Sequence, residues 1–205
     1  MEPSTWDKER YEEYIEDVKI ARSEMKSRKL YPLETILCDL YALPSHNFQT
    51  YYAIIYECSG GLKMVYAKPQ IYANMYAEPV KMYRFSTSRE VQKHPGFDGR
   101  IIVGMKRLSD AFSEQIRNII ENLPDRHILG EKLIVIDGAF QAVRVFGGDA
   151  VIKEAAYYKA DMIPFRNETE WSAGYLENLY LRVGELIGDH LNTEQKEMLR
   201  RMERR

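Results

Sequence analysis

The sequence has few cysteines and no long apolar run. Its two cysteines, Cys38 and Cys58, are too few for a disulfide framework in 205 residues, and their spacing is not that of a metal site. We expect both to be buried thiols. No apolar run approaches the roughly 18 residues that span a bilayer, and the polar, acidic start does not resemble a signal peptide. These absences predict a soluble cytoplasmic protein without a membrane partner.

The motifs of common catalytic and cofactor sites are also missing. There is no Gly-x-x-x-x-Gly-Lys phosphate loop, no Gly-x-Gly-x-x-Gly fingerprint, no Gly-x-Ser-x-Gly elbow and no His-Glu-x-x-His pair. None of the four histidines has a second histidine or cysteine at ligand spacing: they are His46, His94, His127 and His190. The sequence therefore predicts no cofactor and no metal, and it favours a non-enzymatic function.

One glycine-rich loop is the best candidate for an active site. In the segment His94-Pro-Gly-Phe-Asp98-Gly99, an imidazole and a carboxylate share a short stretch beside basic residues. Such a loop could hold a general base that a carboxylate orients, or a metal that assists hydrolysis. Asp98-Gly99 is also a common turn into a strand, and we favour that interpretation. A metal-assisted hydrolase with His94 and Asp98 in its site is the alternative function.

Segments rich in β-branched and aromatic residues, separated by glycine turns, predict two sets of hairpins. The first set is a β-meander over 132–158, with turns at Asp137-Gly138 and Gly147-Gly148-Asp149. The second set joins Phe48–Cys58 to Leu62–Lys68 through a Ser59-Gly60-Gly61 turn. Glycine is diagnostic here because it supplies the positive φ that tight turns need.

Other parts of the sheet are less clearly marked. Residues 34–43 fit a helical face, but Ile36, Cys38, Leu40 and Ala42 also alternate and lead to a turn cluster, so we predict a strand. Two further strands are expected over 80–85 and 100–105. The predicted sheet segments therefore extend over residues 34–105 and continue in the meander.

Three apolar stripes with helical spacing predict the helices. The first helix spans 4–29, the second spans 109–123 with Ser109 as its N-cap, and the third spans 169–191. Residues 192–205 form a short charged helix or a frayed tail. Because strands and helices do not alternate strictly, we predict one α+β domain over 1–205. Its antiparallel or mixed sheet has about six to eight strands and packs with the three helices.

Tyrosine is the residue type that most exceeds its usual share. The chain has 15, and seven of them fall in one stretch: Tyr51, Tyr52, Tyr56, Tyr66, Tyr72, Tyr76 and Tyr83. Neighbouring strand residues point to opposite faces, so we expect at least one of Tyr51 and Tyr52 to be exposed. Exposed tyrosines are enriched in interfaces. The predicted binding residues are therefore Tyr51, Tyr52, Tyr56, Tyr66, Tyr83 and Arg84. The competing interpretation is that tyrosine simply suits half-buried strands.

These features favour a non-enzymatic protein-interaction domain of the accessory or immunity type, by analogy only. The partner is a second protein or another copy of the chain. A second alternative comes from the tyrosines and the basic residues between Ser59 and Leu108, which could bind single-stranded nucleic acid. The acidic first helix makes that alternative less favourable.

Overall fold

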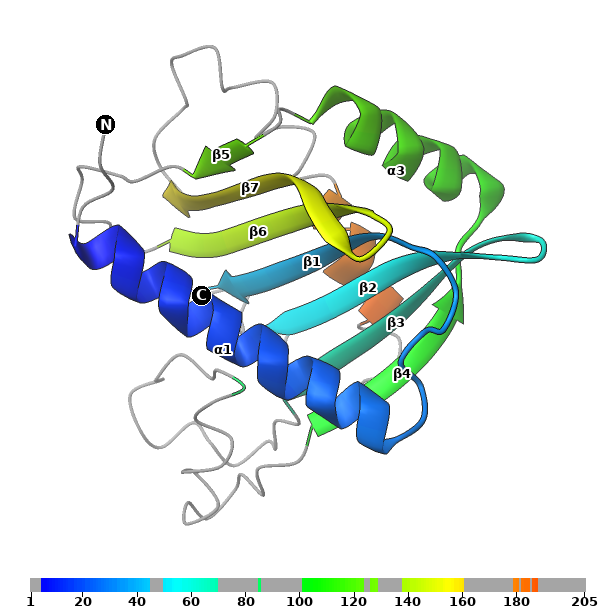
Figure 1. Cartoon of the computed structure of the whole chain (residues 1–205), viewed down its shortest axis with the longest axis horizontal. Helices are drawn as coiled ribbons and strands as arrows, with labels where there is room; N and C mark the ends of the chain where they lie inside the picture. Colours follow the sequence, from blue (N-terminus) through cyan, green and yellow to red (C-terminus); the bar gives the residue numbers. More distant parts are fainter. Residues whose placement is uncertain are drawn as a thin grey trace, which may run out of the picture.

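The centre of the molecule is a seven-stranded sheet with the order β4-β3-β2-β1-β6-β7-β5 (Figure 1). The computed structural model describes residues 5–44, 50–69, 85, 101–123, 126–128, 138–160, 179–180, 182–184 and 186–187. The strands are β1 (Ile36–Pro44), β2 (Tyr51–Cys58), β3 (Gly61–Pro69), β4 (Ile101–Arg107), β5 (Arg126–Ile128), β6 (Gly138–Gly147) and β7 (Ala150–Ala160). All neighbours are antiparallel except β5 and β7. This confirms the predicted α+β fold class.

Helices cover both faces of this sheet. Helix α1 (Thr5–Ser27) crosses one face, as Figure 1 shows. Helix α3 (Asp110–Asn122) and helical residues between 179 and 187 pack against the other face. Ser109 caps α3 as predicted, because its side chain accepts a hydrogen bond from the Phe112 amide. In the described part of the chain, no helix is long and apolar enough to cross a bilayer.

The strand prediction for residues 34–43 is confirmed by β1. Cys38, Leu40 and Ala42 enter the core below α3, whereas Tyr41 and Leu43 enter the core below α1. Both sets are buried because a helical layer lies on each side. A strand covered on both faces reads as a nearly continuous apolar run, which explains why its sequence also fitted a helix.

Both predicted glycine hairpins between described strands are present. The β2–β3 turn uses Gly60 with φ of 102°, and the β6–β7 turn uses Gly148 with φ of 65°. The turn predicted at Asp137-Gly138 needs one correction, because Gly138 already belongs to β6, which pairs with β1 along one edge and with β7 along the other. The strand expected at 133–137 lies outside the described residues.

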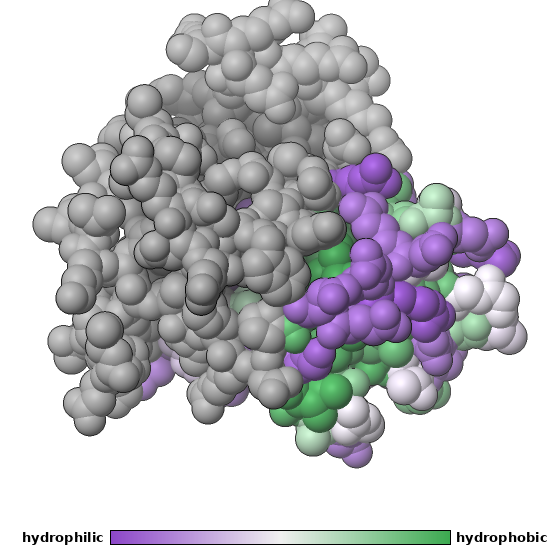
Figure 2. Space-filling view, turned by 90° about the horizontal axis from the view of Figure 1, so that it is seen from above, coloured by the Kyte–Doolittle hydropathy of each residue, from purple (hydrophilic) through white to green (hydrophobic). Residues whose placement is uncertain are grey.

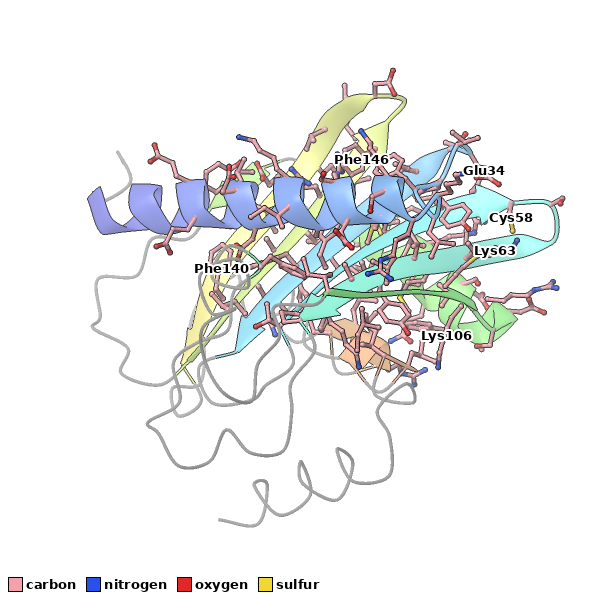
Figure 3. All side chains as sticks on the ribbon, turned by 90° about the horizontal axis from the view of Figure 1, so that it is seen from below. Glu34, Cys58, Lys63, Lys106, Phe140 and Phe146 are labelled. Atoms are coloured by element: carbon pink, nitrogen blue, oxygen red, sulfur yellow. The ribbon has the colours of Figure 1, made fainter. Side chains whose placement is uncertain are left out.

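The hairpin turns define one end of the sheet, which we call the turn end. It contains the α1–β1 connection (28–35), the β2–β3 turn and the β6–β7 turn, because β1 begins where β2 and β6 end. Figure 3 shows Glu34, Cys58 and Phe146 together at this end. Of the predicted strand at 80–85, only Phe85 is described, and it is buried.

Candidate functional site

A row of charged side chains lies buried between α1 and the sheet. Glu154, Arg144 and Asp39 are direct cross-strand partners on β7, β6 and β1, and they alternate in charge. Asp39 is only 1% exposed. Burying a carboxylate is costly unless cations and hydrogen bonds compensate for the lost water. The contacts around Asp39 supply both.

Asp39 accepts four hydrogen bonds. Arg144 binds it in bidentate fashion, with Nε 3.0 Å from Oδ1 and Nη2 on Oδ2. From α1, Arg22 Nη2 donates to Oδ2 at 2.8 Å, and Tyr52 donates its hydroxyl hydrogen to the same oxygen at 2.6 Å. Arg22 Nε also donates to Tyr52 Oη at 2.6 Å. These bonds join α1, β1, β2 and β6 into one polar network.

Aromatic rings enclose the two guanidinium groups. Arg22 Cζ lies 5.4 Å from the Phe146 ring centre and 5.8 Å from that of Tyr52. Arg144 Cζ lies 5.6 Å from the Tyr14 ring and 5.7 Å from the Phe146 ring. Burial by itself would lower the pKa of each arginine, but the hydrogen bonds and charges of Asp39 and the tyrosines outweigh it and raise the pKa. Both side chains therefore stay charged.

Two further polar contacts attach α1 to the sheet. Tyr41 donates to the buried Asp17 at 2.5 Å, and Tyr11 donates to Glu154 at 2.8 Å. Burial, assisted by the charge of Asp39, raises the pKa of the Tyr14 and Tyr52 phenols. Burial also raises the pKa of the Cys38 thiol. Groups of this kind do not exchange protons near neutral pH, so we assign the network a structural role.

The prediction of exposed tyrosines on the sheet was wrong. Tyr51, Tyr52, Tyr56 and Tyr66 are all at most 3% exposed. Adjacent residues do point to opposite faces, but the helices cover both faces. Tyr51 donates to the Tyr180 carbonyl at 3.0 Å on the α3 side, whereas Tyr52 joins the network under α1. These four residues form no exposed binding surface.

The structure does not describe the remaining predicted site residues, which are Tyr83, Arg84, His94 and Asp98. Among the residues that it does describe, no group of three His, Cys, Asp or Glu side chains could hold a metal ion. The buried tyrosines also offer no stacking platform for nucleic-acid bases. Lys68, from the basic segment, is itself buried and donates to the Ile187 carbonyl at 3.1 Å.

Exposed aliphatic side chains are the feature that the sequence did not reveal. Leu33 is 98% exposed in the α1–β1 connection, and Val151 and Ile152 are 45% and 53% exposed at the β6–β7 hairpin. All three belong to the turn end. In Figure 3 the tip of this hairpin stands clear of the sheet. In Figure 2, apolar and hydrophilic surface lie side by side on the described part of the molecule.

The β6–β7 hairpin, which carries Val151 and Ile152, is anchored at its base. Val151 lies opposite Phe146, whose ring contacts the guanidinium groups of Arg22 and Arg144. The pairing then shifts between Val145 and Phe146, which leaves Ile152 as an extra residue. Such a bulge redirects a side chain. A Cβ on Gly147 would lie 2.9 Å from Ile152 Cγ2, so glycine there gives Ile152 its space.

Two lysines lie on either side of the C-terminus of α1: Lys26 in its last turn and Lys29 in the α1–β1 connection. Lys29 has a φ of 57°, a left-handed conformation that usually belongs to glycine. Its amide donates to the Lys26 carbonyl at 3.0 Å, and the Leu30 amide donates to the Met25 carbonyl at 2.9 Å. Lys26 Nζ is 4.9 Å from the Tyr31 ring centre. The turn end therefore presents cations as well as aliphatic side chains.

Comparisons of the chain with protein-family models, with curated proteins and with solved structures find no significant match.

Proposed function

We propose that this chain is a protein-interaction domain that binds another protein through its turn end. The observation that carries the proposal is the exposure of Leu33, Val151 and Ile152 at the same end of one sheet. Single exposed apolar residues are normal, but several of them at the same end of a sheet are a candidate contact surface. We call these three residues the turn-end contact. A partner that fits it offers apolar side chains.

The buried network supports the proposal because it fixes both segments that present the contact. Arg22 holds the end of α1 near the α1–β1 connection, and its guanidinium lies against Phe146 at the base of the hairpin. A contact surface that is already rigid loses less conformational entropy when it binds. The buried network around Asp39 thus preorganises the turn-end contact.

Lys29 gives a second line of support. A left-handed conformation costs a non-glycine residue roughly 1–2 kcal/mol. Backbone strain of this kind is found preferentially at functional positions. Lys29 lies in the same connection as Leu33 and gives this segment a positive charge, and charge increases the rate of association with a complementary partner.

The experiment is a comparison of two variants in affinity capture. The double variant Val151→Asp/Ile152→Asp places charges in the contact. The matched control is Ala111→Asp, which adds a charge at an exposed position in the first turn of α3, where a carboxylate is favourable. Tagged wild-type and variant chains are incubated with an extract of the source cells, and captured proteins are identified by mass spectrometry.

We expect one protein in a stoichiometric amount with the wild type and with Ala111→Asp, and its loss with the double variant. Circular dichroism and thermal unfolding of all three chains establish that the fold is retained, because exposed positions change stability little. Capture that is equal for the double variant and the control would contradict the proposal. A capture that contains no stoichiometric protein with wild type would also contradict it.

A further inference from the structure

Strand β4 forms one edge of the sheet, and this edge carries apolar side chains. Among the described strands, β4 pairs with β3 alone. Met105 is 42% exposed, and Ile102 and Val103 are half-buried. The backbone groups along an edge strand are a ready template for pairing with another strand. An edge of this kind either carries features that block further strand pairing or pairs with another strand.

Among the described residues, β4 lacks the protections that a strand's own sequence and pairing can supply. These are a very short strand, proline, bulges or charged residues along the strand. The opposite edge follows this rule, because β5 has only three residues. In contrast, Ile101–Arg107 has seven residues and no proline, pairs with β3 without a register shift, and has charged residues only at its last two positions.

We infer that β4 pairs with β4 of a second copy, which joins two sheets into one continuous antiparallel sheet. Edge-to-edge pairing of identical antiparallel strands requires a two-fold axis perpendicular to the sheet. The register that uses all seven residues has Gly104 at this axis. Val103 of one copy then faces Met105 of the other, and Ile102 faces Lys106. This contact is separate from the turn-end contact.

The charges of β4 favour that register over its alternatives. Lys106 and Arg107 of one copy lie opposite Ile102 and Ile101 of the other, so no cation directly opposes a cation. Like charges placed directly opposite each other are destabilising. A register centred on Lys106 would place two lysines face to face. The sequence of the edge is therefore complementary to itself in the fully paired register.

Gly104 also suits the position on the axis. It is the cross-strand partner of Tyr66, and a Cβ at position 104 would collide with the Tyr66 phenol. The tyrosine ring therefore covers the glycine and extends to the edge of the sheet. In the paired sheet, two rings cover two adjacent glycines. Aromatic coverage of this type compensates for the weak packing of glycine in an edge strand.

The test is the oligomeric state of the full chain, measured by sedimentation velocity. A seven-residue edge is a small interface, so we expect weak dimerisation and use chain concentrations from about 1 to 500 μM. Met105→Lys adds a charge to the exposed edge, and Asn118→Lys is the matched control at an exposed position of α3 that belongs to neither proposed contact. We expect a concentration-dependent dimer for wild type and Asn118→Lys and a monomer for Met105→Lys. A wild-type monomer at every concentration would overturn the inference, as would a dimer that Met105→Lys leaves intact.

The register has an independent test that does not depend on weakening the dimer. Val103→Cys and Met105→Cys chains are mixed under a mild oxidant, which accepts the two electrons and two protons released by the two thiols. Directly opposed strand residues are close enough for a disulfide. We expect covalent dimers in the mixture and not in either variant alone. Equal cross-linking in the separate variants, or none in the mixture, would contradict this register.

Discussion

Asp39→Asn removes a buried carboxylate that joins α1 to three strands, with almost no change in side-chain shape. In the wild type, this side chain accepts hydrogen bonds from Arg22, Arg144 and Tyr52. The amide that replaces it has one acceptor oxygen and an NH₂ group that faces donors. The two guanidinium groups would then share a site without their anion.

The size of the effect follows from the burial of the two arginines. Removing one partner from a buried ion pair costs about 3–5 kcal/mol, because an uncompensated charge stays behind. The Arg144 side chain is 11% exposed, so its charge has little access to water, whereas Arg22 is 25% exposed. We therefore expect Asp39→Asn to cost about 3–5 kcal/mol. Arg22→Met should cost less, because Arg144 still pairs with Asp39.

Urea unfolding followed by circular dichroism measures these differences. A domain is typically stable by about 5–15 kcal/mol, so Asp39→Asn should remain folded with a much lower midpoint. The exposed pair Arg117–Glu57 serves as a control, since exposed pairs contribute about 0–1 kcal/mol. A loss below about 1 kcal/mol for Asp39→Asn would refute the assignment of a stabilising network.

Three further predictions concern the packing, the phenols and the α1 terminus. Gly104→Ala should cost about 1–3 kcal/mol in urea unfolding, because the new Cβ displaces Tyr66; an unchanged midpoint would contradict this. Tyr14 and Tyr52 have raised pKa values, so the folded state favours the neutral phenols. The free energy of unfolding should therefore be independent of these two groups below about pH 10 and should fall as the pH rises further. Unfolding midpoints that stay constant as the pH rises past 10 would refute this. Lys29→Gly should raise the free energy of unfolding by about 1 kcal/mol and slow partner association; a destabilised variant would contradict the assigned strain.

Most of the described strands and helices could be predicted because their signals are local, whereas the three-residue β5 was not predicted. Gly60 and Gly148 mark their turns directly, and Ser109 marks the start of α3. The order of the strands could not be read in this way, since β1 and β6 pair across a long sequence separation. Local patterns find a strand's sequence neighbours, whereas β1 lies beside β6 although the two strands are distant in the sequence.

The candidate site was harder to predict, because exposure depends on the layers around the sheet. Local alternation correctly placed Tyr51 and Tyr52 on opposite faces, but it does not show that helices cover both faces. The buried network had one signal in the sequence. Asp39 and Arg144 are single charges inside apolar strands, and such charges usually have a buried partner. No pattern in the sequence around Val151 distinguishes this exposed residue from a valine of the core.

Hydrogen exchange of the chain with and without its captured partner tests the proposed function most directly. Amide protection is measured peptide by peptide across the full chain at saturating partner. If the turn-end contact binds the partner, protection should increase over residues 30–35 and 147–152, around Leu33, Val151 and Ile152. Unchanged exchange in both segments, with new protection confined to another surface such as the exposed side of α3, would contradict the proposal.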